Sequence, residues 1–126
     1  MMRRLAALAS TLLLAPVAFA EVPTPDAGRA TFEALCVNCH GPLGQGDGPA
    51  GRSLLPVPRD FTVGQFKFDA DADGRAGSDE DLFLVIRDGA GPSGGNPLMA
   101  AWGHLGDEQV RELVTYVRSL KGANAD

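Results

Sequence analysis

The chain has 126 residues, 44% of them apolar, and it carries 11 basic and 16 acidic side chains for a formal net charge of −5. This length suits one domain. The acidic balance argues against nucleic-acid binding, which depends on basic side chains that neutralise phosphates.

The first twenty residues are typical of a secretory signal peptide. The positive pair Arg3-Arg4 is followed by an apolar run, and Ala18-Phe19-Ala20 fits a cleavage site. The alternative is a retained membrane anchor, but the run is short for a bilayer span and contains Pro16. We therefore expect residues 1–20 to be removed on export.

The charge of the exported chain bears on its partners. Cleavage after Ala20 removes two arginines, takes the formal net charge from −5 to −7 and leaves residues 21–126 as one domain. Such a charge favours a redox partner protein with a basic docking patch, and it serves solubility equally well. In a bacterium the exported domain would lie in the periplasm, where we expect a monomer.

The first predicted helix runs from Asp26, as its N-cap, to about Leu35. Phe32 and Leu35 give this helix an apolar side, and Gly28 lies four residues before Phe32. The helix leads directly into the most informative segment of the chain.

That segment is Cys36-Val37-Asn38-Cys39-His40, a C-x-x-C-H motif. Each cysteine can form a thioether with one vinyl group of a porphyrin, and His40 can then offer an imidazole nitrogen to the iron. The motif predicts one covalent haem c. Two alternatives exist for C-x-x-C: a thioredoxin-like dithiol, which expects a βαβ context, and a zinc site, for which His104 would be the remaining Cys or His ligand.

Two loops follow the motif. Residues 41–48 are rich in glycine and superficially resemble a phosphate-binding loop, but no strand precedes them, so we expect tight turns that bring backbone against the haem edge. Residues 53–68 are broken by Pro56 and Pro58. The apolar side chains of this second loop are expected to cover the haem: Leu54, Leu55, Val57, Phe61, Phe66 and Phe68.

An acidic stretch over residues 69–80 matches the calcium-loop pattern D-x-D-x-D-G-x5-E. Gly74 allows its sharp turn, but the incoming helix of an EF-hand is missing. A solvated acidic turn that caps a helix is the competing interpretation, and a bound Ca²⁺ would have a structural role. The candidate ligands are the side chains of Asp69, Asp71, Asp73 and Glu80 and the carbonyl of Arg75.

Two more helices are predicted. One spans Asp79 to Asp88, with Ser78 as N-cap, Asp81 as its capping-box partner and Gly89 as its stop. The other runs from about Asp107 to Leu120. Its apolar stripe follows an i, i+3, i+4 pattern: Val110, Leu113, Val114, Val117 and Leu120.

The second axial ligand of the iron has to come from far along the chain. Residues 21–126 contain one methionine, Met99, in a proline-containing loop, and His104 is the alternative. Met99 is the favoured ligand. Two protein ligands would close the iron to substrates and suit electron transfer, whereas an open sixth position would permit peroxide or gas chemistry.

The chain resembles the class I c-type cytochromes, which carry a single haem. The resemblance lies in the C-x-x-C-H motif after an N-terminal helix, in the segment Pro97-Leu98-Met99-Ala100-Ala101-Trp102, and in the helix that follows it. It implies an all-α fold of about three main helices and long loops around one covalent haem, with the N- and C-terminal helices crossing. Gly28 and Phe32 would then meet the face that bears Tyr116 and Val117.

The same resemblance implies roles for single residues. His40 and Met99 would be the axial ligands, and Arg59 and Trp102 would approach the haem propionates. The implied function is that of a soluble periplasmic electron carrier without a small-molecule substrate or a catalytic residue. Two rivals stay open: a dedicated cytochrome subunit of a larger oxidoreductase complex, and a peroxidase-like haem enzyme with an open sixth position.

Overall fold

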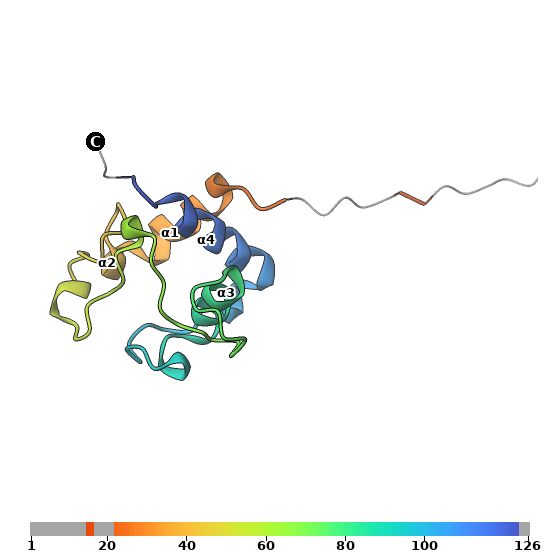
Figure 1. Ribbon diagram of the computed structural model, residues 1–126. Coiled ribbons are helices and arrows are strands. Elements are labelled where there is room, and N and C mark those ends of the chain that lie inside the picture. Colours follow the sequence, from red (N-terminus) through yellow and green to blue (C-terminus); the bar gives the residue numbers. More distant parts are fainter. Residues whose placement is uncertain (1–14, 17–21, 124–126) are drawn as a thin grey trace, which may run out of the picture.

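The structure, a computed structural model, describes residues 15–16 and 22–123. Within these residues every regular element is helical and no strand occurs, so the predicted all-α class is confirmed. Four α-helices form the body, and four single 3₁₀ turns lie in the loops between them (Figure 1). The helices are α1 at Pro25–Leu35, α2 at Val37–His40, α3 at Asp79–Asp88 and α4 at Asp107–Ser119.

Nearly all of the predicted signal peptide, residues 1–20, lies outside the described part of the chain. None of the helices that the structure describes combines the length and the hydrophobicity that a bilayer span requires. The assignment of residues 21–126 as one exported domain therefore stays a prediction.

Helix α1 begins two residues earlier than the sequence predicted. Thr24, not Asp26, is the N-cap, and its Oγ1 accepts a hydrogen bond from the Ala27 N–H at 3.4 Å. Pro25 occupies the first helical position, where a missing N–H costs nothing. Asp26 lies in the first turn, where its negative charge complements the positive end of the helix dipole.

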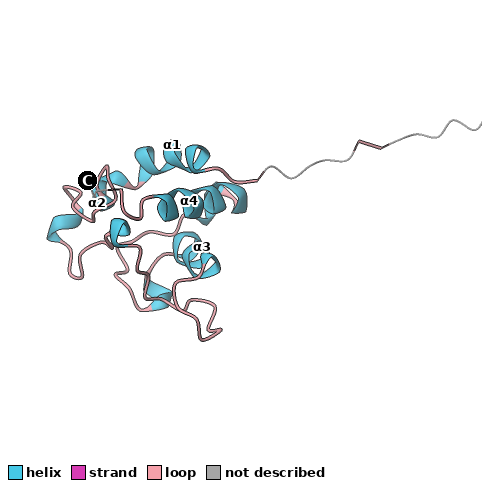
Figure 2. Ribbon diagram, turned by 45° about the horizontal axis from the view of Figure 1, so that its top comes forward, coloured by secondary structure: helices cyan, strands magenta, loops and turns pink. Residues whose placement is uncertain are grey.

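Helices α1 and α4 cross in close contact, as Figures 1 and 2 show. Gly28 makes this approach feasible, because a Cβ at that position would collide with the carbonyl of Glu112 on α4. One turn later the ring of Phe32, which is 1% exposed, lies 5.1 Å from the ring of Tyr116. The expected meeting of these two helix faces is confirmed.

The hydrophobic core lies where α1, α3 and α4 meet. The predicted stripe of α4 is buried along its whole length, and Phe32 of α1 and Leu82 and Phe83 of α3 pack against it. Helix α4 ends at Ser119, with Leu120 as its C-cap, one residue before the predicted end. The buried stripe residues are Val110, Leu113, Val114, Val117 and Leu120.

Helix α3 has the predicted bounds and the predicted caps. The Ser78 hydroxyl accepts from the Asp81 N–H at 3.0 Å, and the Asp81 carboxylate accepts from the Ser78 N–H at 2.8 Å, which completes a capping box. Gly89 ends the helix with φ of +83°.

The glycine-rich stretch over residues 41–48 forms tight turns that pack on the end of α2, and its contact with the edge of a cofactor stays a prediction. The N–H groups of Gly46 and Gly48 donate to the carbonyls of His40 and Cys39 at 2.8 and 3.1 Å. These bonds satisfy carbonyls that the short helix leaves without partners. Of the whole stretch, only Gln45 lines the main cavity of the molecule.

Candidate cofactor site

A cavity of about 580 Å³ lies beside α2 and α3, and residues from every part of the domain contribute to its wall. This volume falls in the usual range for small-molecule and cofactor sites. Most of the lining is apolar, with contributions from the loop that follows α2, from α3 and from α4. The chemically distinctive lining residues are Cys36, Cys39, His40, Met99, Arg59 and Trp102.

His40 is held by a main-chain hydrogen bond. Its Nδ1 lies 3.3 Å from the carbonyl oxygen of Arg59, and because a carbonyl can only accept, Nδ1 carries the hydrogen. Burial lowers the pKa of His40 below its ordinary value, although the bond to Arg59 opposes that shift. The neutral ring then has a lone pair on Nε2, which is the state of a histidine that can ligate a metal.

A row of aromatic rings fixes the position of the imidazole. The ring of Phe61 stacks on His40, with centroids 4.5 Å apart and planes inclined by 20°. Phe61 in turn contacts Phe32 edge-on at 6.2 Å, and Phe32 packs on Tyr116. The crossing of α1 and α4 therefore sets where His40 can lie.

Both cysteines of the motif are free and half-buried at the cavity wall. Burial, with a smaller contribution from Cys39, raises the pKa of the Cys36 thiol to about 11. Cys36 is the C-cap of α1 and the N-cap of α2, and Cys39 lies in the last turn of α2. One helical turn thus presents two thiols and one imidazole to the same cavity.

The loop that carries Met99 is fastened to the end of α3. The Met99 N–H donates to the Asn96 carbonyl at 3.0 Å, and its carbonyl accepts from the Ala90 N–H at 3.4 Å. On the other side of the loop the Trp102 N–H donates to the Ile86 carbonyl at 2.9 Å. These bonds hold Met99 and Trp102 against the cavity wall.

His104, the alternative ligand, lies elsewhere. It is exposed on the 3₁₀ turn Gly103–Leu105, its ring lies 5.7 Å from that of Trp102, and it is not part of the cavity wall. The arrangement favours Met99 over His104 as the second donor, and the ligand role itself stays a prediction.

Six side chains were expected to cover the haem. All of them but one lie in the wall of the cavity. Leu55 is 89% exposed and does not line the cavity, which corrects the expectation for this residue. Leu54 lines the cavity, whereas Leu55 lies in the bend that follows and faces solvent. The residues that do line it are Leu54, Val57, Phe61, Phe66 and Phe68.

Arg59 and Trp102 both line the cavity, and their approach to the propionates stays a prediction. The sequence reasoning missed three charged residues of the wall, Asp60, Lys67 and Asp81. The Lys67 Nζ lies 5.1 Å from the centre of the Phe68 ring. No sequence pattern indicates that a single lysine between two phenylalanines of a loop lines a cavity. For Asp81, the sequence pattern predicted only its role as a helix cap.

The structure does not gather the five residues predicted to ligate calcium. Glu80 lies in the first turn of α3, and its Oε2 is 3.3 Å from Nη1 of Arg111 on α4. The carboxylate of Asp73 is 2.6 Å from the Arg75 guanidinium. Two of the predicted ligands, Asp73 and Glu80, therefore form ion pairs with arginines.

A different set of three carboxylates comes together instead. Asp69, Asp71 and Asp81 each have a carboxylate oxygen within 4.8 Å of the others. Asp81 was not a predicted ligand, and its oxygens accept hydrogen bonds from the loop backbone and from Ser78. The loop is thus the acidic cap of α3, which was the competing interpretation of the pattern.

The residues of the cavity fit a haem c. They include two free thiols from the C-x-x-C turn, an imidazole whose Nε2 is free, a thioether from a distant loop, and apolar walls. An all-α chain with this donor set around one cavity defines a c-type cytochrome, the class of electron-transfer proteins that carries a covalent haem.

Comparison with known families agrees. The model of the family described as "Cytochrome C oxidase, cbb3-type, subunit III" matches residues 23–117, and the chain belongs to this family of c-type cytochromes.

Two relatives extend the comparison. The chain is 31% identical over 103 residues to a protein described as cytochrome c oxidase subunit 2 of Bacillus sp. (strain PS3), a match that covers 79% of this chain and 27% of the relative. Among solved structures, a chain of the reducing HAO-like protein complex of Kuenenia stuttgartiensis is 35% identical with a TM-score of 0.66, covering 82% of this chain and 46% of that one. The chain thus spans about a quarter and just under half of these two relatives.

Proposed function

We propose that the protein carries single electrons through one haem c, which Cys36 and Cys39 attach and which His40 and Met99 ligate. The haem supplies an Fe(III)/Fe(II) couple when it is bound. The observation that supports the proposal is that all four side chains line one cavity although Met99 lies far from the motif in sequence. If His40 and Met99 both hold the iron, no position would be left for a substrate, and the main-chain bonds to Asn96 and Ala90 would keep the Met99 loop in place.

Three groups of residues would each have a role in electron transfer. The bond from Nδ1–H to the Arg59 carbonyl fixes the tautomer and the plane of His40. A methionine thioether stabilises the reduced iron better than a second imidazole does, so Met99 raises the reduction potential. The apolar wall excludes water, which keeps reorganisation small when the charge at the iron changes.

The test is a mass and a visible spectrum of protein purified from a host that matures c-type cytochromes. We expect the mass to exceed that of the polypeptide by one haem, and the oxidised protein to show the weak far-red band of thioether–iron(III) coordination. Met99→Leu should keep the haem and lose the band, whereas the matched control His104→Ala should keep both. A colourless protein with the mass of the bare polypeptide would contradict the proposal.

A second candidate is that the chain works as a cytochrome subunit of a larger oxidoreductase complex. The relatives favour it, since one is described as an oxidase subunit and the other is a chain of a protein complex. Gentle extraction of the tagged protein from its own host, followed by size-exclusion chromatography, separates the candidates. A haem-containing species at the size of the monomer supports the free carrier, and stable co-elution with other redox subunits supports the complex.

We also propose that residues 1–20 are removed on export to the periplasm. The support is the sequence pattern of a positive start, an apolar run and the Ala18-Phe19-Ala20 site. Fractionation of the native host should find the haem protein among released periplasmic proteins, with Glu21 as its first residue. Recovery with the membranes and an intact N-terminus would instead indicate an uncleaved anchor.

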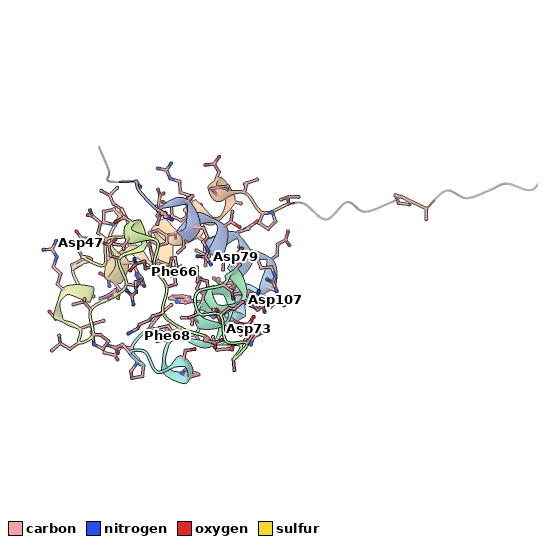
Figure 3. All side chains as sticks on the ribbon, viewed as in Figure 1. Asp47, Phe66, Phe68, Asp73, Asp79 and Asp107 are labelled. Atoms are coloured by element: carbon pink, nitrogen blue, oxygen red, sulfur yellow. The ribbon has the colours of Figure 1, made fainter. Side chains whose placement is uncertain are left out.

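For docking we propose a partner with a basic patch that approaches the side of α3. In the view of Figure 3, Asp73, Asp79 and Asp107 are seen on the side of α3, and Asp47 is seen on the opposite side. Electron exchange with a small basic redox protein should slow as salt is added. Asp107→Asn should lower the rate at low salt about twofold, and Asp47→Asn should leave it nearly unchanged. Equal effects of the two variants would show that net charge alone matters.

A further inference from the structure

Asp81 is the one charged side chain that is buried in the described part of the chain, at 1% exposure, and it lines the cavity. Its Oδ1 accepts from the N–H groups of Ala70 and Asp71 at 2.6 and 3.2 Å. Its Oδ2 accepts from the N–H and the hydroxyl of Ser78, both at 2.8 Å. These four bonds tie both ends of the acidic loop to the first turn of α3.

The charge of this carboxylate is not compensated by a cation. All four donors are neutral groups, and Asp81 takes part in none of the ion pairs formed among the described residues. Its neighbours on α3 differ, because Asp79 pairs with Arg118 and Glu80 with Arg111. No ion pair therefore neutralises Asp81, although the Arg75 guanidinium in the same loop lies near enough to interact with its charge.

The carboxylate is ionised at neutral pH. Burial by itself would raise the pKa of Asp81, but the hydrogen bonds from Ser78, Asp71 and Ala70 outweigh that effect and hold the pKa below its ordinary value. Asp69 and Asp71 bring further negative charge within 4.8 Å. A fixed anion thus forms part of a wall that is otherwise largely apolar.

We propose that Asp81 is a tuning residue, whose buried negative charge favours the oxidised form of the cofactor and so lowers the reduction potential. The inference rests on the proposed function, since it needs a haem in the cavity. Addition of one electron from a mediator would lower the positive charge of the bound haem by one and so would weaken its attraction to an anion in the cavity wall. A buried charge acts through a lower effective dielectric than the exposed carboxylates, which water and salt screen.

Met99 and Asp81 would then have opposite effects on the reduction potential. Met99 stabilises the reduced state through its thioether, and Asp81 stabilises the oxidised state through its charge. The potential would be set by their balance, and Asp81 could shift it without any change at the ligands.

The experiment is a redox titration of the purified haem-loaded protein and of Asp81→Asn, which keeps the shape of the side chain and removes its charge. We expect the equilibrium constant for reduction by a fixed mediator to rise about three- to tenfold in the variant. The charge-matched control Asp107→Asn removes an exposed carboxylate at the start of α4 and should change that constant by less than about twofold.

The variant Ser78→Ala distinguishes an effect of the Asp81 charge from an effect of loop packing. This variant removes one donor and the N-cap hydroxyl but keeps the anion, so it should lower the melting temperature and leave the reduction equilibrium nearly unchanged. If Ser78→Ala reproduces the shift of Asp81→Asn, loop packing and not charge is responsible. The inference is equally overturned if Asp81→Asn shifts the constant no more than Asp107→Asn does.

A second variant decides the matter if Asp81→Asn does not load haem. Ala70→Lys leaves the carboxylate and its donors in place and adds a cation at a half-buried position beside them. It should raise the constant in the same direction, and an unchanged or lower constant overturns the inference. A wild-type protein without a reversible haem couple would overturn the proposed function itself, whereas a reversible couple that none of these variants shifts overturns the tuning role alone.

Discussion

The two walls of the cavity are built in different ways. On the α2 side, Cys36, Cys39 and His40 come from one turn of helix, and the loop over residues 41–48 packs directly on its carbonyls. On the α3 side, Met99 lies in a loop held by a few main-chain bonds, and Leu98 beside it is 69% exposed. Figure 1 shows the corresponding helices, α2 and α3, on opposite sides of the domain.

The difference shows how much each wall depends on the rest of the fold. The α2 wall is local in sequence and is supported from behind by the crossing of α1 and α4 through the rings of Phe32 and Phe61. The α3 wall depends on contacts between segments far apart in sequence. We therefore expect substitutions in the helix crossing behind the α2 wall to destabilise the whole domain. Substitutions in the α3 wall should instead release Met99 while the haem stays attached.

The largest effect is expected from Gly28→Ala. Its methyl group would collide with the Glu112 carbonyl and force α1 and α4 apart, which should lower the free energy of unfolding by about 3 kcal/mol. The control Ala30→Gly changes an exposed position of the same helix and should cost about 1 kcal/mol through helix propensity. Guanidinium denaturation of the haem-loaded protein measures both. Similar losses in the two variants would mean that the helix crossing tolerates a wider spacing.

Gly89→Ala tests the other wall. The residue has φ of +83° and ψ of 166°, which suits glycine alone, and a Cβ there would lie 2.8 Å from the Met99 carbonyl. We expect a loss of about 2 kcal/mol, together with a weaker far-red band at unchanged haem content. Gly94→Ala is the matched control, because it also has positive φ but open space around its Cβ, so it should keep the band. A band that persists in Gly89→Ala would show that the Met99 loop is held more firmly than its few bonds suggest.

Ser78→Ala should have a smaller effect on stability. It removes the N-cap of α3 and one of the two Ser78 donors to Asp81, and the loss of a serine cap typically costs about 1 kcal/mol. Ser53→Ala, at an exposed position in a 3₁₀ turn, is the control and should be nearly neutral. Thermal unfolding of the haem-loaded protein checks the pair, and equal melting temperatures would contradict a capping role.

The elements that the sequence predicts well are those with local causes. The bounds and caps of α3 follow from Ser78, Asp81 and Gly89, and the stripe of α4 follows from its 3.6-residue period. The haem-attachment motif that points to a c-type cytochrome is a run of five consecutive residues. In each case the residues that decide the structure are neighbours in sequence or one helical turn apart.

The expectations that failed depend on geometry that no local pattern contains. Glu80 satisfied the spacing of a calcium loop, but the helix that it opens turns it toward Arg111. Leu55 is as apolar as Leu54, but it lies in a bend and is exposed, whereas Leu54 lines the cavity. Asp81 had a visible signal as a cap, and its burial in the cavity wall became evident only from the packed loop.

The smallest effect on stability is expected from acidification. A comparison of the wild type with Asp81→Asn isolates the contribution of the Asp81 carboxylate in the α3 wall. The pKa of Asp81 in the folded protein lies below its ordinary value, which is about 3.9 in an unfolded chain. Below that pH the unfolded state binds a proton more readily, so the stability contributed by Asp81 is present above about pH 4 and is lost as the pH falls through the folded-state pKa.

The melting temperature of the wild type should therefore fall more steeply than that of Asp81→Asn on acidification below about pH 4, and Asp107→Asn should follow the wild type. Parallel curves for the wild type and Asp81→Asn would show that the hydrogen bonds to this carboxylate do not hold its proton affinity down, and would weaken the case for a fixed anion in the wall.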